Sequence, residues 1–217
     1  MRPCASLFIA SVLCVASAAP AAPIDYQVNV DTSSLLGSTG SLDFNFEPGP
    51  LVSQAASLQV LGFASDGALA CSPTLSGDVS GALPATLTFD NATGFNDYFE
   101  GFTFGKNLRF DVSLYGPALS SPDGTSTSGS AFAFGLFSDA AGTMPALTTD
   151  TTEGFAFKLE VNLNGTTRVT NFSAPTAVSA VPEPSGLALL GTVLAWCGAR
   201  HLRRQRRRQA TTFAPDL

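Results

Sequence analysis

Carboxylates are the side chains that could carry acid–base chemistry in the long central segment of this 217-residue chain. The segment from Ile24 to Ala180 has 15 Asp and Glu residues and no histidine, because the single histidine is His201. A carboxylate pair roughly 5 to 9 Å apart can hydrolyse a glycosidic bond. Asp97 and Glu100 are the nearest candidates, but their odd spacing on an extended strand directs them to opposite faces. We therefore expect a solvated acidic surface, no catalytic residues, and a protein that is not an enzyme.

Metal, cofactor and glycan sites have little support in the same segment. Without histidine, and with Cys71 as its only cysteine, the segment can form neither the usual zinc sites nor an internal disulfide. Carboxylates and turn carbonyls suit calcium, but the EF-hand pattern is absent, so calcium binding is left open, no metal ligands are assigned and no cofactor is expected. Glycan platforms usually present exposed Trp or Tyr, and this segment has only Tyr26, Tyr98 and Tyr115. Any affinity for polysaccharide is therefore expected to be weak.

Charge is segregated along the chain. Residues 24–180 combine 15 acidic residues with 4 basic ones, a net charge of −11, whereas six arginines follow position 199. A surface this acidic repels phosphate groups, because nucleic-acid binding depends on Lys and Arg releasing counterions. We therefore exclude nucleic acid as a partner.

The first residues of the chain have the three parts of a secretory signal peptide. Arg2 is followed by an apolar run over residues 7–15 and then by small residues at positions 16–19. A positive start, a short apolar core and a small-residue cleavage site are typical of secretion. We predict that residues 1–18 are a signal peptide, which signal peptidase removes by cutting near Ala18.

The C-terminal segment has the pattern of a single membrane anchor, in which a short motif, an apolar stretch over residues 185–199 and a basic cluster follow one another. Fifteen helical residues extend only about 22 Å, less than the roughly 30 Å hydrocarbon core, so snorkelling arginines and local thinning must help. The positive-inside rule places the cluster and the tail at 209–217 in the cytoplasm. The motif is Val181, Pro182, Glu183 and Pro184, and the cluster is Arg200, Arg203, Arg204, Arg206, Arg207 and Arg208.

Residues 181–208 resemble the PEP-CTERM sorting signal of exopolysaccharide-producing Gram-negative bacteria, because they combine Pro-Glu-Pro, a short apolar helix and an arginine cluster in that order. The resemblance implies cleavage near Pro-Glu-Pro by the membrane protease exosortase, followed by transfer or release to the cell surface. The expected precursor lies in the inner membrane with its C-terminus in the cytoplasm, and the mature protein is at the surface or extracellular. The residues after Arg208 depart from the pattern, which usually ends at the basic cluster.

Between these ends, residues 24–180 are predicted to form an all-β body, a jelly-roll-like antiparallel β-sandwich. Glycine and proline recur roughly every eight to twelve residues, and no long segment has helical periodicity. About nine strands are enough for two packed sheets. We expect them at residues 26–30, 42–46, 58–63, 85–89, 98–104, 108–114, 131–137, 155–163 and 168–172.

Four Phe-x-Phe pairs indicate the core of this body. Side chains two apart on a strand share a face, so each pair delivers two rings to one side. Burying one Phe contributes about 1.5 to 3 kcal/mol, and we predict that all eight rings are in the core rather than on an aromatic ligand platform. The pairs are Phe44/Phe46, Phe102/Phe104, Phe132/Phe134 and Phe155/Phe157.

The body also resembles, over nearly its whole length, a group of uncharacterised PEP-CTERM exported proteins. That group has no established activity, so the resemblance implies export and assigns no site. We expect an exported, non-enzymatic cell-surface or matrix protein, associated with exopolysaccharide or biofilm. The alternatives are a weak glycan-binding module and a glycan-active enzyme that uses carboxylates. The likeness lies in residues 30–35, 42–46, 48–50, 102–105 and 116–124.

Overall fold

In the computed structural model, the described residues are 22–182, Trp196 and Arg200. The predicted signal peptide at 1–18, the arginines other than Arg200 and the tail at 209–217 lie outside this part, as do Glu183, Pro184 and most of the apolar stretch. No helix within the described residues is both long and apolar enough to cross a membrane.

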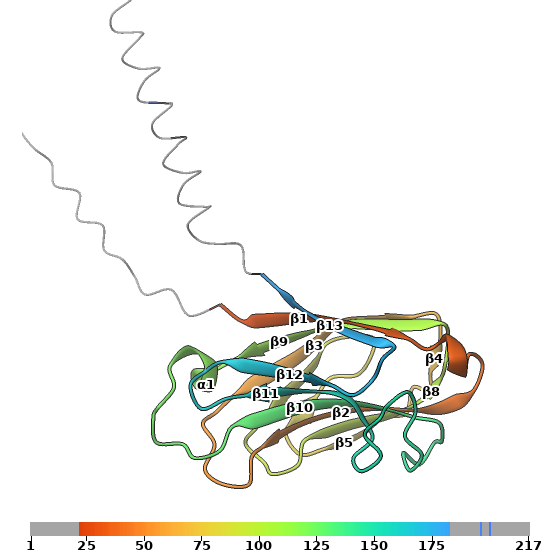
Figure 1. Ribbon diagram of the computed structural model, residues 1–217, viewed down its shortest axis with the longest axis horizontal. Coiled ribbons are helices and arrows are strands. Elements are labelled where there is room, and N and C mark those ends of the chain that lie inside the picture. Colours follow the sequence, from red (N-terminus) through yellow and green to blue (C-terminus); the bar gives the residue numbers. More distant parts are fainter. Residues whose placement is uncertain (1–21, 183–195, 197–199, 201–217) are drawn as a thin grey trace, which may run out of the picture.

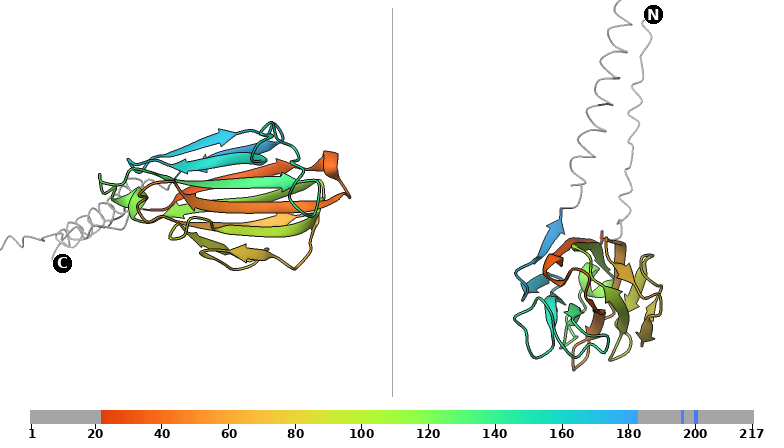
Figure 2. Two further views of the ribbon diagram at one scale, coloured as in Figure 1. Left: turned by 90° about the horizontal axis from the view of Figure 1, so that it is seen from below. Right: turned by 90° about the vertical axis from the view of Figure 1, so that its right-hand side faces the viewer.

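The body is all-β and consists of two antiparallel sheets that pack face to face in a β-sandwich-like arrangement (Figures 1 and 2). Sheet A contains, in spatial order, β13 (Thr176–Val181), β1 (Ile24–Asp31), β9 (Asn107–Tyr115), β3 (Ser57–Ser65), β7 (Leu87–Asp90) and β6 (Val79–Ser80). Sheet B contains β12 (Thr167–Asn171), β11 (Phe155–Val161), β10 (Ser130–Phe137), β2 (Thr39–Pro48), β8 (Asp97–Thr103) and β4 (Ala68–Leu69), with β5 (Thr74–Ser76) also paired with β8. The helical elements of the body are η1 (Ser33–Leu35) and α1 (Pro117–Ser120).

All nine predicted strands are present, which confirms the reading of alternating apolar residues bounded by glycine and proline. The sequence did not indicate β4, β5 or β6, which have only two or three residues each. It also did not indicate β13, a longer strand rich in alanine and valine. Alanine is a weak strand former, and β13 is held by its pairing with β1, at the opposite end of the body's sequence.

Phenylalanine rings from both sheets form the centre of the core. Phe44 of β2 and Phe134 of β10 have ring centroids 4.8 Å apart, and Phe110 of β9 lies 5.2 Å from Phe44 and 5.0 Å from Phe134. These three rings join sheet B to sheet A. Edge and tilted contacts of this kind add about 0.5 to 1.5 kcal/mol per pair to the area buried.

Seven of the eight rings in the Phe-x-Phe pairs are buried as predicted, but the prediction for Phe155 is wrong. Phe134 of β10 is opposite Phe157, and the next residue, Gly135, is opposite Phe155, so Ala156 is an extra residue in β11. Ala156 and Phe157 are both fully buried. This β-bulge breaks the alternation of faces and turns Phe155 to the outer face of sheet B.

Both ends of the body lie on neighbouring strands of sheet A. Asp25, near the start of β1, is directly opposite Val181, the last residue of β13. β1 pairs with β9 on its other side, so β13 is the edge strand of the sheet. The chain therefore enters and leaves the body at the same end of one strand pair (Figure 1).

Candidate ligand groove on sheet B

The outer face of sheet B has small residues along its central strand and larger polar residues on either side. Ala131, Ala133 and Gly135 of β10 face outward, because the alternate residues Phe132 and Phe134 are in the core. Across the sheet, β10 is paired with β2 on one side and with β11 on the other. A strand without large side chains between two strands that carry them leaves a trough.

The walls of this trough follow from the register of the strands. On β2, Asn45 is opposite Ala133, and Glu47 is opposite Ala131. On β11, the same two alanines are opposite Lys158 and Glu160 respectively. The resulting cavity has a volume of about 490 Å³. It is lined by these side chains and by Ser128, Glu153, Phe155, Asn162 and Leu163, among others.

A loop positions two lining residues, Glu153 and Phe155. The Asp150 carboxylate accepts hydrogen bonds from the backbone N–H groups of Thr152 and Glu153, at 3.1 and 3.2 Å, which fixes the turn before β11. Gly154 follows with φ of 82°, and a Cβ there would lie 2.9 Å from the Phe137 ring. The left-handed backbone at this glycine therefore sets the direction in which Phe155 begins β11.

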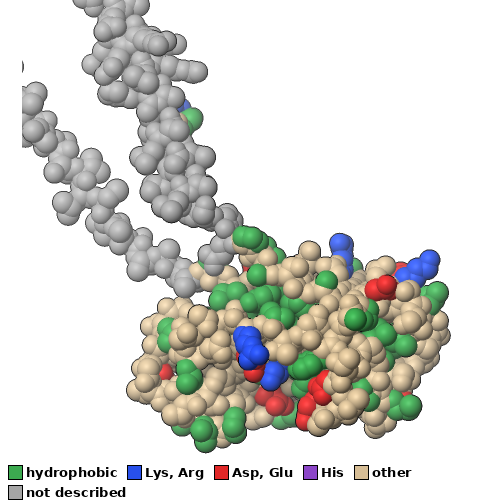
Figure 3. Space-filling model, viewed as in Figure 1, with side chains coloured by type: hydrophobic (Ala, Val, Ile, Leu, Met, Phe, Trp, Pro, Cys, Tyr) green, Lys and Arg blue, Asp and Glu red, His purple; other side chains and the backbone are tan. Residues whose placement is uncertain are grey.

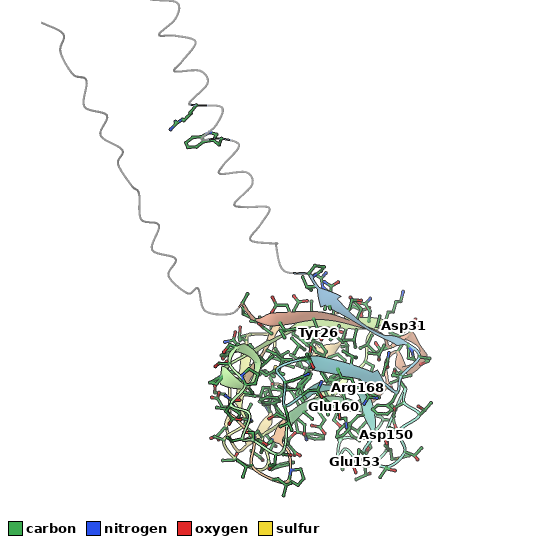
Figure 4. All side chains as sticks on the ribbon, turned by 60° about the vertical axis from the view of Figure 1, so that its left-hand side comes forward. Tyr26, Asp31, Asp150, Glu153, Glu160 and Arg168 are labelled. Carbon is green, nitrogen blue, oxygen red and sulfur yellow. The ribbon has the colours of Figure 1, made fainter. Side chains whose placement is uncertain are left out.

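Basic side chains gather at one wall of the groove. The Lys158 ammonium lies 3.1 Å from the Glu160 carboxylate, and the Arg168 guanidinium of β12 lies 3.9 Å from the same group. Figure 4 shows Glu160 and Arg168 over β11 and β12, with Glu153 on the neighbouring loop. Figure 3 shows charged side chains clustered over the same strands. Lys158 and Arg168 therefore both interact with the same carboxylate, that of Glu160.

The acids on the opposite side lack such partners. Within the described residues, neither Glu47 nor Glu153 has a basic group within 4 Å. Partial burial raises the pKa of Glu47, and the nearby carboxylates of Asp97 and Glu153 raise it further. Glu47 is thus held among like charges at the edge of the groove.

A carboxyl pair lies farther along the same face. The side chains of Asp43 on β2 and Asp97 on β8 hydrogen-bond to each other, and burial is the main reason that the pKa of each is raised. The Oδ1 atoms of both residues are buried and have no hydrogen-bond partner among the described residues. Such a pair is stable when it shares one proton, because two adjacent carboxylates repel each other.

Glu100 is on the other side of sheet B, as its odd spacing from Asp97 predicts. Its Oε2 atom accepts a hydrogen bond of 2.5 Å from the Tyr98 hydroxyl, and its Oε1 atom accepts one of 2.8 Å from the Cys71 N–H. The Tyr98 oxygen also accepts a hydrogen bond from the Leu83 N–H at 3.1 Å. This interior network ties two loop segments to β8, and burial with the bond to Glu100 raises the pKa of Tyr98.

The positions of Asp43, Asp97 and Glu100 bear on whether two carboxylates of the body could together hydrolyse a glycosidic bond. Asp97 and Glu100 cannot act on one substrate from opposite faces of a sheet. Asp43 and Asp97 are adjacent and share a hydrogen bond, whereas the two carboxyl groups of a glycosidase are separated by about 5 to 9.5 Å so that the substrate fits between them. Among the described residues, no group of three His, Cys, Asp or Glu side chains is arranged to hold a metal ion.

The sorting residues predicted from the sequence lie away from the groove or outside the described residues. Val181 is exposed at the end of β13, and Pro182 follows it as an exposed residue outside any element. Arg200 has helical backbone, and its guanidinium lies 3.8 Å from the centre of the Trp196 ring. The remaining motif and cluster residues are Glu183, Pro184, Arg203, Arg204, Arg206, Arg207 and Arg208, which lie outside the described residues.

The groove residues were not predicted as a site. One signal was present in the sequence, since Asp43, Asn45 and Glu47 alternate with Phe44 and Phe46 and must share the solvent face of one strand. The partner strands could not be identified from that pattern. In comparisons with protein-family models, curated proteins and solved structures, nothing matches this chain.

Proposed function

We propose that this chain is an exported, non-enzymatic cell-surface or extracellular-matrix protein, sorted through the PEP-CTERM-like signal at residues 181–208. The proposed body is a jelly-roll-like β-sandwich. Its strand order supports this, because the chain crosses between the sheets: β2 of sheet B lies between β1 and β3 of sheet A along the chain, and β8 of sheet B lies between β7 and β9 of sheet A. Exosortase, signal peptidase and extracellular polysaccharide are the proposed partners.

The observation that carries the proposal is the end of β13 at Val181, directly before Pro182. Proline lacks the N–H donor that another ladder bond would need, so the strand ends where the proposed sorting motif begins. Cleavage near Pro184 would leave every strand of the body intact. At the other end, cleavage near Ala18 would also fall outside the sheet, because β1 begins at Ile24.

Fractionation of the producing cells tests this proposal. We expect the body in the surface or extracellular fraction, and a membrane-bound precursor when Glu183 is replaced by alanine or when residues 200–208 are deleted. Deletion of residues 209–217 is the matched control, because it shortens the tail without touching the motif or the cluster, and it should leave sorting unchanged. Recovery of the body in the cytoplasm with Met1 intact would refute export.

A second candidate function, glycan binding, is favoured by the groove on sheet B. A trough with small residues in its floor, one aromatic ring and several amide, hydroxyl and carboxylate groups suits a polyhydroxylated chain. Phe155 supplies an apolar face for sugar C–H groups, although it lacks the polar tip of tyrosine or tryptophan. This candidate attributes binding to the body and is compatible with export.

A further inference from the structure

The groove has an excess of negative charge on the side formed by β2 and the loop before β11. Glu47 and Glu153 both line it, and each lacks a basic partner within the described residues. The charged residues that line the groove are Glu47, Glu153, Glu160 and Lys158, and Arg168 lies beside Glu160, so the acids exceed the bases by one. Lys158 is already paired with Glu160 at 3.1 Å. A cationic ligand group would therefore find two free carboxylates.

Asp97 adds negative charge next to the groove, although it does not line the groove itself. Its side chain lies on the same face beside Asn45, which lines the groove, and it is nine-tenths buried. Its Oδ1 atom has no hydrogen-bond partner among the described residues. The pair that it forms with Asp43 adds negative potential at the Glu47 end of the groove.

The position of the groove within the sheet favours a cationic sugar chain over a cationic peptide as its ligand. The floor strand β10 is paired with β2 and β11 on its two sides, so its backbone N–H and C=O groups are used within the sheet. An extended lysine-rich peptide would gain no added strand pairing here, because strand addition requires a free edge. A sugar chain needs no backbone ladder and can use the Phe155 ring and the polar walls.

We propose that this groove binds a polysaccharide segment that carries free amino groups, with an ammonium group held between Glu47 and Glu153. The proposal rests on the second candidate function, glycan binding, and narrows it to amine-bearing sugars. Asn45, Ser128 and Asn162 supply hydrogen-bonding groups for hydroxyls along the groove. A uronic-acid polymer is disfavoured, because its carboxylates would meet the unpaired acids of the protein.

Binding should also depend on pH. The charged groups around Glu47 are Asp43 on its own strand, Asp97 on β8, Glu153 on the loop, and the Lys158–Glu160 pair on β11, with Arg168 of β12 beside Glu160. As the pH falls, Glu47 takes up a proton before an ordinary glutamate does, and the attraction for an ammonium group weakens. Affinity should therefore be greatest where the ligand amine is already protonated and Glu47 is still ionised, and it should decrease at more acidic pH, while a neutral sugar is affected much less.

Calorimetric titration of the purified full-length chain tests the proposal, with a β-1,4-linked glucosamine tetramer as the probe and the fully N-acetylated tetramer as its neutral counterpart. We expect the glucosamine tetramer to bind at least about tenfold more tightly than the acetylated one at low salt. The variant that combines Glu47→Gln with Glu153→Gln should lose about tenfold of that affinity. Asp111→Asn, which removes an acid from the outer face of sheet A, is the control and should bind as the parent does.

A second variant tests whether the ligand occupies the groove, without changing the charge of the protein. Ala131→Gln places a longer side chain on the groove floor and should abolish binding of either tetramer, while the β-sheet circular dichroism stays unchanged. Equal binding of the acetylated and free tetramers would overturn the role of the ammonium group and leave glycan binding standing. Tighter binding of a lysine tetrapeptide, or binding that survives in both groove variants, would overturn the proposal, as would no binding of either sugar. None of these results depends on where the protein is located in the cell.

Discussion

The carboxyl groups of Asp43 and Asp97 hydrogen-bond to each other on adjacent strands of sheet B. In most proteins, acids this close occur where one proton is shared or a cation is held between them. The third acid of this region, Glu47, lies on the same strand as Asp43, and its pKa is raised first by burial and then by repulsion from Asp97 and Glu153. The acids on the outer face of sheet B therefore repel one another, and protonation or a bound cation would reduce this repulsion.

Stability should fall as the pH rises through neutrality, and Asp43 should be the main cause. Burial and Asp97 raise the pKa of Asp43 to about 9, so between about pH 4 and pH 9 the folded protein keeps a proton that the unfolded chain releases. The free energy of unfolding therefore decreases across this range. Asp43→Asn removes the titration, and urea unfolding at pH 5 and pH 9 should show a smaller decrease than in the parent. The same decrease in Asp43→Asn as in Asp111→Asn would contradict the shared proton.

Removal of the Tyr98 hydroxyl should lower the free energy of unfolding, because this hydroxyl connects two hydrogen bonds of the interior network. Tyr98→Phe removes the donor to Glu100 and leaves the Leu83 N–H without its acceptor, and buried groups left unpaired in this way cost about 1 to 3 kcal/mol. Chemical denaturation should show a loss of that size. Tyr115→Phe is the matched control at a half-buried position and should change the free energy of unfolding by less than about 0.5 kcal/mol. Equal effects of the two substitutions would rule out the network.

The bulge in β11 predicts opposite roles for two phenylalanines of one Phe-x-Phe pair. Phe157 is fully buried against Phe132 and Phe134, so Phe157→Ala should destabilise the body by about 3 to 5 kcal/mol. Phe155 lines the groove, and Phe155→Ala should cost less than about 1.5 kcal/mol while weakening glycan binding. Thermal unfolding of the two variants compares them directly. A loss of stability in Phe155→Ala as large as in Phe157→Ala would contradict the bulge, because it would indicate that Phe155 is also in the core.

The register between β1 and β13 can be tested by cross-linking. Gln27 and Ser179 are directly opposite and both exposed, so replacing both with cysteine, in a Cys71→Ser background, should give a disulfide on oxidation of the body. The mass should fall by about 2 Da, and reduction should reverse the change. The control pairs Gln27→Cys with Ala177→Cys, which is two residues out of register and should form the bond far less readily. Preferential cross-linking of the control pair would refute the register.

The strands could be predicted because their signal is local. Alternation of apolar and polar residues, as at Phe44 to Phe46, marks a strand whatever its partners are. β13 could not be found this way, because its alanine-rich sequence becomes a strand only by pairing with β1. The Phe155 error has a similar origin, since the bulge depends on how β11 matches β10 at Gly135.

The groove could not be predicted from the sequence, because its residues come from strands that are far apart in the chain and whose pairing no local pattern reveals. The pattern on β2 showed that Asp43, Asn45 and Glu47 face one way, but not that Ala131 and Ala133 would lie beside them. Pairing of Asp97 with Asp43 likewise required β8 and β2 to be neighbours in register. The acid nearest to Asp97 along the chain is Glu100, and the alternation of side chains on β8 places these two on opposite faces of the sheet.

The intact mass of the protein recovered from the cell surface or the medium is the most direct test of the central claim, which is export followed by removal of both terminal segments. We predict a species that begins near Ala19 and ends near Pro184, with all strands from β1 to β13 retained. Cells without active exosortase should accumulate a membrane-bound form that still contains Trp196. A surface species that retains residues 187–217 in cells with active exosortase would contradict the account, as would a cytoplasmic species that begins at Met1.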